Sequence, residues 1–180
     1  FFKKIITKKK KIEILKKKLT LRIIGMGGSI LGAKAIFSFL KHKIKKEVEF
    51  TDNLNSKNIL SSKKKYLNLI ISKSGNTIET ITNSNILIKK KDINIFITGN
   101  KKNYLFTLAK QLKSEIIEHN NYIGGRYSVL SEVGMLPAEL MGLDVKKFKQ
   151  INNIVKNKRF VNLLVANVNS TLFFLKKKKI

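Results

Sequence analysis

The sequence predicts an α/β fold, a three-layer, doubly wound and mostly parallel sheet with flanking helices. Short apolar runs recur along the chain, and most are followed by a segment with apolar residues at helical spacing. Turns rich in glycine or hydroxyl side chains separate the two. Strands that alternate with helices in this way form a parallel sheet covered on both faces. The 180 residues, 43% of them hydrophobic, suffice for one such domain with its own core.

The predicted elements follow one another as repeated strand-turn-helix units. In the first unit a strand ends in glycine and a helix begins just after Ser29. Strands are predicted at residues 21–26, 48–51, 66–72, 93–98 and 114–118. Helices are predicted at residues 30–40, 77–89 and 104–112.

The last third of the chain has a helical pattern. Pro137 is expected to start or kink a helix, and Asp144 is placed to cap a helical segment at 145–155. A further helix is expected at about 160–175. We therefore predict three parts, an N-terminal helical segment (1–20), the α/β domain (21–143) and a helical connection (144–180) whose end resembles the approach to another strand.

The formal net charge of +27 would by itself favour nucleic acid or an anionic membrane as a partner. Lysine supplies nearly all of this charge, and the lysine runs are scattered along the chain without interleaved aromatic side chains. Lysine, asparagine and isoleucine are abundant throughout, as an AT-rich coding sequence would produce. We interpret the charge as a solvated surface, with a polyanion site as the alternative, and predict neither a nucleic-acid nor a membrane partner.

Other features of the composition narrow the class of protein. No apolar run approaches the roughly 20 residues of a membrane helix, and the first residues do not read as a signal peptide. The absence of cysteine excludes a disulfide framework and a thiolate metal site. A cytoplasmic globular protein is therefore expected.

The first turn with chemical potential is the string from Gly25 to Ser29, between the first strand and its helix. Glycines let the backbone approach a ligand, and the free N–H groups of the following helix face an anion, so a phosphate fits there. A dinucleotide fingerprint would need an acidic residue about 20 positions later, and Asp52 comes too late. The alternative is a tight turn without a ligand.

A second turn, from Ser72 to Thr77, follows the buried strand at the same edge of the sheet. It places several hydroxyl groups and backbone donors at another helix N-terminus, where two such turns can converge on one anion. The alternative is that these hydroxyls only cap the helix. The third string, from Gly124 to Ser131, combines two glycines with Arg126, whose guanidinium can bind anionic oxygens or anchor a loop.

These three strings, in this order, resemble the sugar isomerase (SIS) domain. Residues 124–131, with Gly134, Leu136 and Pro137, are similar to the signature of the glucose-6-phosphate isomerase family. The resemblance spans about residues 21–144. It implies a flavodoxin-like SIS fold, a connection that leads to a second SIS domain, and a homodimer that borrows an active-site residue from its partner. It also implies aldose-ketose isomerisation of glucose 6-phosphate and fructose 6-phosphate through a cis-enediol, in glycolysis and gluconeogenesis, without a metal or organic cofactor.

The resemblance implies roles for individual residues as well. Arg126 would lie beside the reacting carbons and stabilise the negative charge of the enediol intermediate. Gly124 and Gly125 would form the loop next to the substrate. The sugar phosphate would be held by the first two turns, at Gly28, Ser29, Ser72, Lys73, Ser74 and Thr77.

The sequence departs from the family pattern in two ways. Ser74-Gly75 stands where the isomerases often have threonine and a bulkier residue, and this form of the second turn is common to the wider SIS superfamily. The family's general base, a glutamate in an acidic-Ser-x-Gly-Lys string, and its later histidine and lysine do not occur before Ile180. We therefore expect a fragment that binds a sugar phosphate without turning it over.

Other residues are candidates for the missing chemistry. His42 is interpreted as a surface residue and His119 as a hydrogen-bonding loop residue. Five carboxylates are near the three strings, and none is favoured over a surface or capping role: Glu79, Glu115, Glu118, Glu132 and Glu139. The alternative to an isomerase is a stand-alone SIS domain that binds a sugar phosphate as a regulator, and the Gly-Gly-Arg-Tyr-Ser string favours the isomerase.

Overall fold

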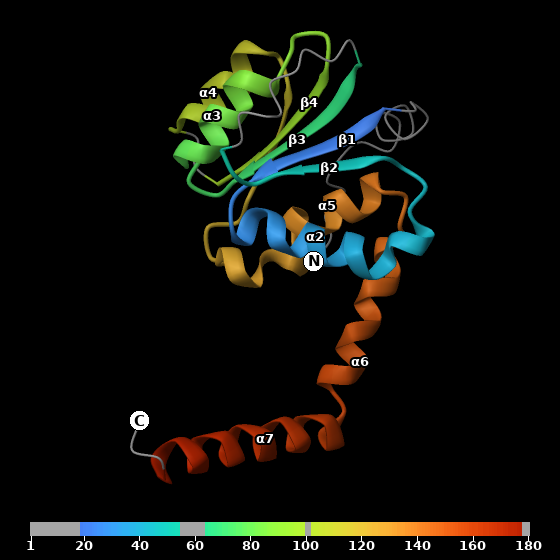
Figure 1. Ribbon diagram of the computed structural model, residues 1–180, viewed down its shortest axis with the longest axis vertical. Helices are drawn as coiled ribbons and strands as arrows, with labels where there is room; N and C mark the ends of the chain where they lie inside the picture. The colour runs from blue at the N-terminus through green and yellow to red at the C-terminus, as the bar shows by residue number, and fades with distance from the viewer. Residues whose placement is uncertain (1–18, 55–63, 100–101, 178–180) are drawn as a thin grey trace. The chain divides into compact units, whose positions relative to one another are not determined.

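Five strands form one sheet in the spatial order β2-β1-β3-β4-β5 (Figure 1). The computed structural model describes residues 19–54, 64–99 and 102–177. The strands are β1 (Thr20–Gly25), β2 (Val48–Thr51), β3 (Tyr66–Ser72), β4 (Ile93–Thr98) and β5 (Glu115–Glu118). Every neighbouring pair is parallel, which confirms the predicted parallel sheet.

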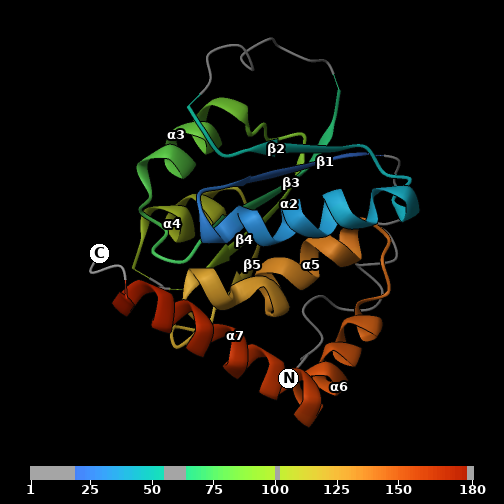
Figure 2. The same ribbon diagram turned by 60° about the horizontal axis from the view of Figure 1, so that its bottom comes forward.

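Helices cover both faces of the sheet, as Figures 1 and 2 show. Helices α2 (Gly28–Leu40) and α5 (Glu132–Leu140) lie side by side on one face. Helices α3 (Ile78–Leu87) and α4 (Tyr104–Gln111) lie on the other. The predicted three-layer, doubly wound fold is confirmed. Two short 3-10 helices belong to the same part of the chain, η1 (Lys41–Lys43) and η3 (Gly125–Leu130).

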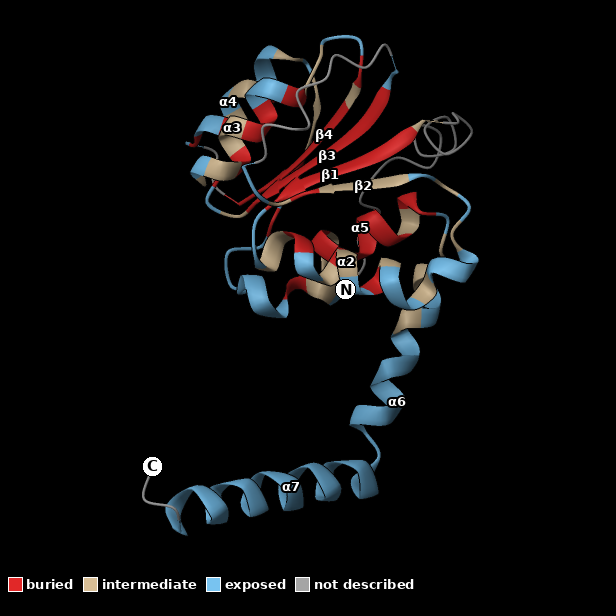
Figure 3. Ribbon diagram, in the orientation of Figure 1, coloured by how far each residue is buried: buried red, intermediate tan, exposed pale blue. Residues whose placement is uncertain are grey.

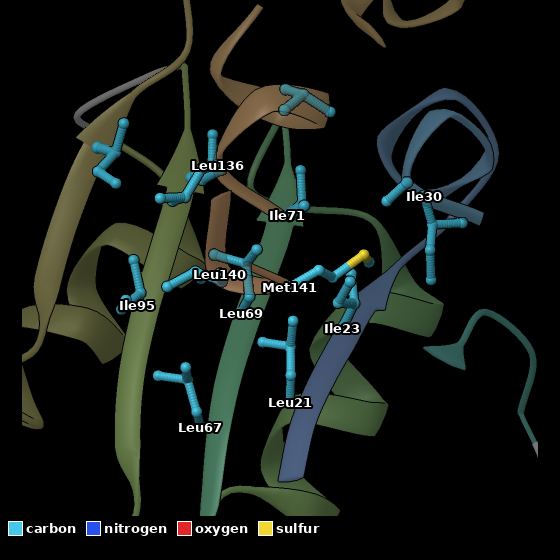
Figure 4. Packing of buried hydrophobic residues seen from close by; sticks show 14 residues of the cluster. Leu21, Ile23, Ile30, Leu67, Leu69, Ile71, Ile95, Leu136, Leu140 and Met141 are labelled. Atoms are coloured by element: carbon cyan, nitrogen blue, oxygen red, sulfur yellow. The ribbon is translucent and has the colours of Figure 1, made fainter. Parts of the chain in front are cut away.

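The larger part of the core lies between the sheet and helices α2 and α5 (Figure 4). Alternate residues of the strands point to this face, and the central strands are buried along their whole length (Figure 3). Each buried leucine or isoleucine contributes on the order of 1.5–3 kcal/mol. The core residues labelled in the close view are Leu21, Ile23, Ile30, Leu67, Leu69, Ile71, Ile95, Leu136, Leu140 and Met141.

The opposite face combines an apolar cluster with a buried polar row. Arg22, Asn68 and Asn94 stand in register on β1, β3 and β4. The Arg22 guanidinium donates from Nε and Nη2 to Glu49 Oε2, at 3.1 and 3.0 Å, and lies 3.6 Å from the centroid of the Tyr66 ring. Asn68 Nδ2 donates to Asn94 Oδ1 at 2.8 Å. These partners offset the cost of burying the Arg22 guanidinium and the Asn68 amide N–H groups, although Asn68 Oδ1 has no hydrogen-bond partner among the described residues.

Several element boundaries differ by one or two residues from the sequence-based expectation, and two helix starts have a clear physical cause. Helix α2 begins at Gly28 rather than Ile30, because Gly27, with φ of 53°, turns the chain directly into the helix. Of the two roles predicted for Pro137, starting or kinking a helix, the first is wrong, because Pro137 lies inside α5, which begins at Glu132. The start is set by Ser131, whose Oγ accepts a hydrogen bond from the Val133 N–H.

Residue contacts divide the chain into two units, Phe1–Leu143 and Asp144–Ile180. The second unit contains the 3-10 helix η4 (Val145–Gln150), α6 (Ile151–Val155) and α7 (Lys158–Lys177). Asp144 caps η4 as predicted, because its Oδ1 accepts from the Lys146 N–H at 3.0 Å. Of the predicted N-terminal helical segment 1–20, residues 1–18 lie outside the described residues, and Thr20 belongs to β1.

Within the described ranges, no helix combines the length and the apolar character needed to cross a membrane.

Lys46, in the segment between η1 and β2, carries a buried ammonium group. It lines a pocket of about 330 Å³ together with Lys43, Lys45, Leu140, Met141 and Gly142. Its Nζ has no hydrogen-bond partner among the described residues. Burial lowers the pKa of Lys46 because the charged form loses hydration. The side chain therefore destabilises the fold at neutral pH.

We predict that Lys46→Met raises the thermal unfolding midpoint at pH 7 by about 1–3 °C, because a thioether of similar length removes the buried charge. The pKa of Lys46 is lower in the folded than in the unfolded chain, so wild-type stability rises as the pH approaches the unfolded value of about 10.4. The advantage of the variant should shrink over that interval. Lys45→Met, which changes an exposed lysine of the same pocket, is the control. Equal midpoint shifts in both variants would contradict the assignment.

Candidate functional site

The candidate site lies at the carboxyl ends of β1 and β3, where the strand order reverses. Strand β1 is paired with β2 on one side and with β3 on the other, so the chain leaves these two central strands toward opposite faces of the sheet. Open parallel sheets bind their ligands at such a point, because the diverging loops leave a crevice. The first two strings of the sequence analysis are the loops that follow these two strands.

The first loop places the N-terminus of α2 at the carboxyl end of β1. Gly27 precedes the helix without a side-chain cap, and the first turn of α2 contains no acidic residue. The uncapped N–H groups and the helix dipole therefore give this end a partial positive charge. Ser29 lies in that first turn and is partly exposed.

The second loop gathers three hydroxyl groups at the N-terminus of α3. The Oγ of Ser72 lies 3.0 Å from Oγ1 of Thr77 and 3.5 Å from Oγ of Ser74, and Ser74 Oγ lies 3.3 Å from Thr77 Oγ1. Thr77 is the N-cap residue of α3, yet its side chain makes no capping hydrogen bond. Ser72 Oγ and Ser74 Oγ accept instead from the main-chain N–H groups of Gly75 and Asn76 in the loop, at 3.1 and 3.2 Å. We call the three residues the hydroxyl cluster.

The Asn103 side chain packs against Gly75 of the second loop. A Cβ atom at Gly75, which has φ of 66°, would stand 1.9 Å from Asn103 Oδ1, so only glycine fits there. The main chains also join, because the Leu105 N–H donates to the Gly75 carbonyl at 3.2 Å. Sequence reasoning missed Asn103, since nothing in its own string indicates a neighbour so far back in the chain.

The third loop reaches the first through a contact between main chains. A Cβ atom at Gly28 would lie 2.4 Å from the carbonyl carbon of Gly125, far inside van der Waals contact. Ser128, buried in η3, donates from Oγ to the Gly125 carbonyl at 2.7 Å and approaches the Gly28 carbonyl at 3.3 Å. Residues about a hundred positions apart thus meet at the N-terminus of α2.

Arg126 follows this contact at once and is exposed. Among the described residues its guanidinium has no hydrogen bond or ion pair. The interpretation of Arg126 as an anchor of the loop is therefore not supported by the described contacts. This solvent-facing guanidinium follows the loop that meets the N-terminus of α2, and it adds positive charge near that helix end.

Lys73 lies within the second loop, but its side chain leaves that loop. Its Nζ donates to the carbonyl oxygens of Asn121 and Ile123, at 2.7 and 2.9 Å. The resemblance implies that hydroxyl and amide groups of the second turn, Lys73 included, hold the phosphate. The ammonium itself contacts the loop that precedes Gly124.

His119 and Glu132 form a buried pair at the base of that loop. His119 Nδ1 hydrogen-bonds Glu132 Oε1, and the His119 side chain is 2% exposed. Burial acts to raise the pKa of Glu132, but the hydrogen bond and charge of His119, with backbone N–H groups that include that of Asn120, outweigh it. The pKa of Glu132 therefore lies below its ordinary value. His119 is a hydrogen-bonding loop residue, as expected, and is closed to a substrate.

The remaining candidates do not gather at the crevice. Glu79 lies in the first turn of α3, where the helix dipole stabilises a carboxylate. Glu115 and Glu118 belong to the edge strand β5, Glu139 to α5, and the exposed His42 to η1. The site therefore presents hydroxyl groups, helix N-termini and Arg126, which can bind an anion and stabilise negative charge.

The chain is similar to proteins of a known family. Residues 1–164 match the family described as Phosphoglucose isomerase. A glucose-6-phosphate isomerase of Acholeplasma laidlawii is 38% identical over 146 residues, which cover 69% of this chain and 34% of that protein. The chain thus spans about a third of the length of this curated relative.

Solved structures share the fold. A hypothetical protein of Thermus thermophilus superposes with a TM-score of 0.66 at 22% identity, over 82% of this chain and 41% of that one. The tagatose-6-phosphate ketose/aldose isomerase of Escherichia coli gives 0.56 at 14% identity, over 79% and 43%. At these identities the likeness concerns the fold alone.

We predict that Gly28→Ala destabilises the first unit by about 2 kcal/mol, because the added methyl group must push two main chains apart. The midpoint of urea unfolding measures the effect. Gly125→Ala is the matched control, since a Cβ atom there meets its nearest atom, the Cα of Gly28, at an ordinary 3.7 Å. Equal loss of stability in the two variants would show that the contact is not as close as described.

We also predict that Glu132→Gln weakens the acid dependence of stability. The pKa of Glu132 is lower in the folded than in the unfolded chain, so its stabilisation is fully present above the unfolded value of about 4.3 and is lost as the pH falls toward the folded value. Unfolding midpoints between pH 7 and pH 3 should fall less steeply in the variant. Glu118→Gln, at an exposed position of β5, should keep the wild-type slope. A wild-type slope for Glu132→Gln would refute the pairing.

Proposed function

Because the chain belongs to the phosphoglucose isomerase family, we propose that it binds the phosphate group of glucose 6-phosphate and fructose 6-phosphate, and that the whole protein interconverts these two sugars. This chain would supply the phosphate site and one arginine at the reacting end. The observation that carries the proposal is the hydroxyl cluster beside two uncapped helix N-termini.

The phosphate site is proposed to consist of the two loops at the switch point. The hydroxyls of Ser72, Ser74 and Thr77 can each donate to a phosphate oxygen once their mutual hydrogen bonds open. Gly28 and Ser29 bring the N-terminus of α2, whose free N–H groups and dipole favour an anion. Two helix ends and three hydroxyls together match the several oxygens of one phosphate group.

The reaction itself requires charge stabilisation at the other end of the sugar. A base removes the proton on C2 of the open-chain aldose, the electrons of that C–H bond form the C1–C2 double bond, and the aldehyde oxygen becomes negative. Return of that proton to C1, and transfer of the hydroxyl proton of O2 to the negative O1, give the ketose and regenerate the base. Arg126 is proposed to stabilise the negative enediol oxygen, an effect worth on the order of a few kcal/mol of barrier. Gly124 and Gly125 leave room for the sugar beside it.

The proton-transferring base is proposed to lie outside the residues that the structure describes. His119 and Glu132 are committed to each other, and the other carboxylates of the described residues do not gather at the crevice. We therefore expect the chain to bind a hexose 6-phosphate weakly and not to turn it over. Measurable isomerase activity of the purified 180-residue chain would overturn this part of the proposal.

A homodimer and a cytoplasmic location are proposed with the activity. Tyr122 and Tyr127, on either side of the Gly124-Gly125 pair, are 76% and 82% exposed. Exposed tyrosines next to a site favour a protein interface, because they bury large area with few rotamers to order. Phosphorylated sugars are charged and stay in the compartment that makes them, so the enzyme is expected there.

We predict that gluconate 6-phosphate binds this chain about tenfold more tightly than glucitol 6-phosphate. The two ligands share the phosphate and carbon chain, but only gluconate carries a carboxylate where the enediol charge would develop. Arg126→Gln should abolish this preference and leave glucitol 6-phosphate affinity within about twofold, because one charge-assisted contact is worth roughly 1.5–3 kcal/mol. Isothermal titration calorimetry measures both.

Two comparisons keep this test specific. Arg159→Gln, an exposed arginine of α7, should preserve the preference for gluconate 6-phosphate. Ser74→Ala combined with Thr77→Val should weaken both phosphorylated ligands alike. If unphosphorylated gluconate bound as well as gluconate 6-phosphate, the phosphate site would be wrong. If Arg126→Gln left the preference intact, the chain would fit a phosphosugar-binding regulator better than an isomerase.

A further inference from the structure

Lys73 joins the two halves of the candidate site. It stands between Ser72 and Ser74 in the second loop, next to the hydroxyl cluster. Its ammonium, however, donates to the carbonyls of Asn121 and Ile123, 48 and 50 residues further along the chain. One side chain therefore ties the proposed phosphate site to the segment that leads directly into Gly124, Gly125 and Arg126.

The tied segment depends on charged side chains for its position. Its main chain makes a turn through the Ile123 N–H and the Asn120 carbonyl, at 3.1 Å. On one side, the Glu132 carboxylate accepts from the Asn120 N–H and from the His119 ring. On the other side, Lys73 donates to two carbonyls. A carboxylate thus holds the N–H side of residues 119–123 and an ammonium holds the carbonyl side.

This geometry gives the Lys73 side chain a role other than neutralising phosphate. An ammonium group has three donors, and two of those on Lys73 are used by carbonyl oxygens. Charge-assisted hydrogen bonds of this kind are short and strong, and they fix the carbonyls relative to the loop that carries the lysine. The hydroxyl cluster and the helix N-termini remain to bind the phosphate.

We propose that Lys73 is a positioning residue that sets the span between the phosphate site and Arg126, and so determines which length of phosphorylated sugar acid or sugar fits between them. The inference rests on the proposed function. The second loop would bind the phosphate end of a ligand and the loop of Arg126 its other anionic end. Lys73 holds these two loops at one separation. Without it, residues 121–126 can shift, and ligands of different lengths become nearly equivalent.

The test uses the full 180-residue chain and a series of aldonic acids that carry a terminal phosphate, with four, five and six carbons. The wild type is expected to prefer one length by about tenfold over the poorest. Lys73→Met, which keeps the aliphatic stem, should reduce this discrimination to about threefold or less. Its affinity for inorganic phosphate should stay within twofold of the wild type. Lys73→Arg, which can still donate to two carbonyls, should restore most of the discrimination.

Hydrogen exchange provides a reading that needs no ligand. Lys73→Met should speed exchange of the amides at 121–127 by about tenfold, whereas Ser74→Ala, which alters the hydroxyl cluster only, should leave them at the wild-type rate. If Lys73→Met does not fold, Lys73→Gln, which can donate to one carbonyl, is expected to show an intermediate increase.

The outcomes separate this inference from the proposed function. If inorganic phosphate affinity fell as steeply as that of the six-carbon ligand, the Lys73 side chain would be a phosphate ligand and the positioning role would be wrong. Unchanged exchange at 121–127 would overturn it as well. If the wild type bound none of the phosphorylated ligands, the proposed function would fail, and the exchange experiment alone would decide whether Lys73 holds the loop.

Discussion

The contact between the main chains of Gly28 and Gly125 is the constraint on which the candidate site depends. A single methyl group at Gly28 would stand 2.4 Å from the Gly125 carbonyl carbon, so the two loops can meet only where a residue has no side chain. The approach carries Arg126 to the N-terminus of α2 and lets Ser128 hydrogen-bond both carbonyls. It is possible because α2 and α5 pack together on the same face of the sheet, and η3, which forms most of the third loop, leads into α5 and contacts both helices.

Two buried charged side chains of the first unit have partners. Arg22 is buried but pairs with Glu49, and Glu132 is buried but accepts from His119 and from backbone N–H groups. Partnered charges of this kind hold elements in place, since breaking a pair leaves an uncompensated buried group. Lys46, without a described partner, is the contrasting case, and its lowered pKa reflects that environment. Arg126 differs from all three because it is exposed, next to the contact between Gly125 and Gly28, and an exposed guanidinium is accessible to an anion.

The net charge of +27 takes on a more modest meaning in this setting. The positive groups with a defined place in the site are few, namely Arg126 and two helix N-termini, with Lys73 turned toward a neighbouring loop. The proposed phosphate site would depend on oriented donors more than on total charge, because hydroxyl and N–H groups can each bind one oxygen of a phosphate. The lysine-rich surface would add long-range attraction for anionic sugars, an effect that salt screens.

The sequence by itself determined the parallel α/β fold and the three loops of the site, because both are written in local patterns. The apolar runs of β1, β3 and β4, and the glycine and hydroxyl strings that follow them, are readable within a few residues. It placed helix ends less well at Gly28 and Pro137, where a glycine turn and the Ser131 cap decided the boundary. Only the tertiary structure decided that Lys73 binds the carbonyls of Asn121 and Ile123, that His119 pairs with Glu132, and that Asn103 supports Gly75. These partners are separated by 13 to 50 residues in the sequence. The residues next to each of them in the sequence do not indicate the partner. Such contacts arise from packing of whole elements, which local propensity does not encode.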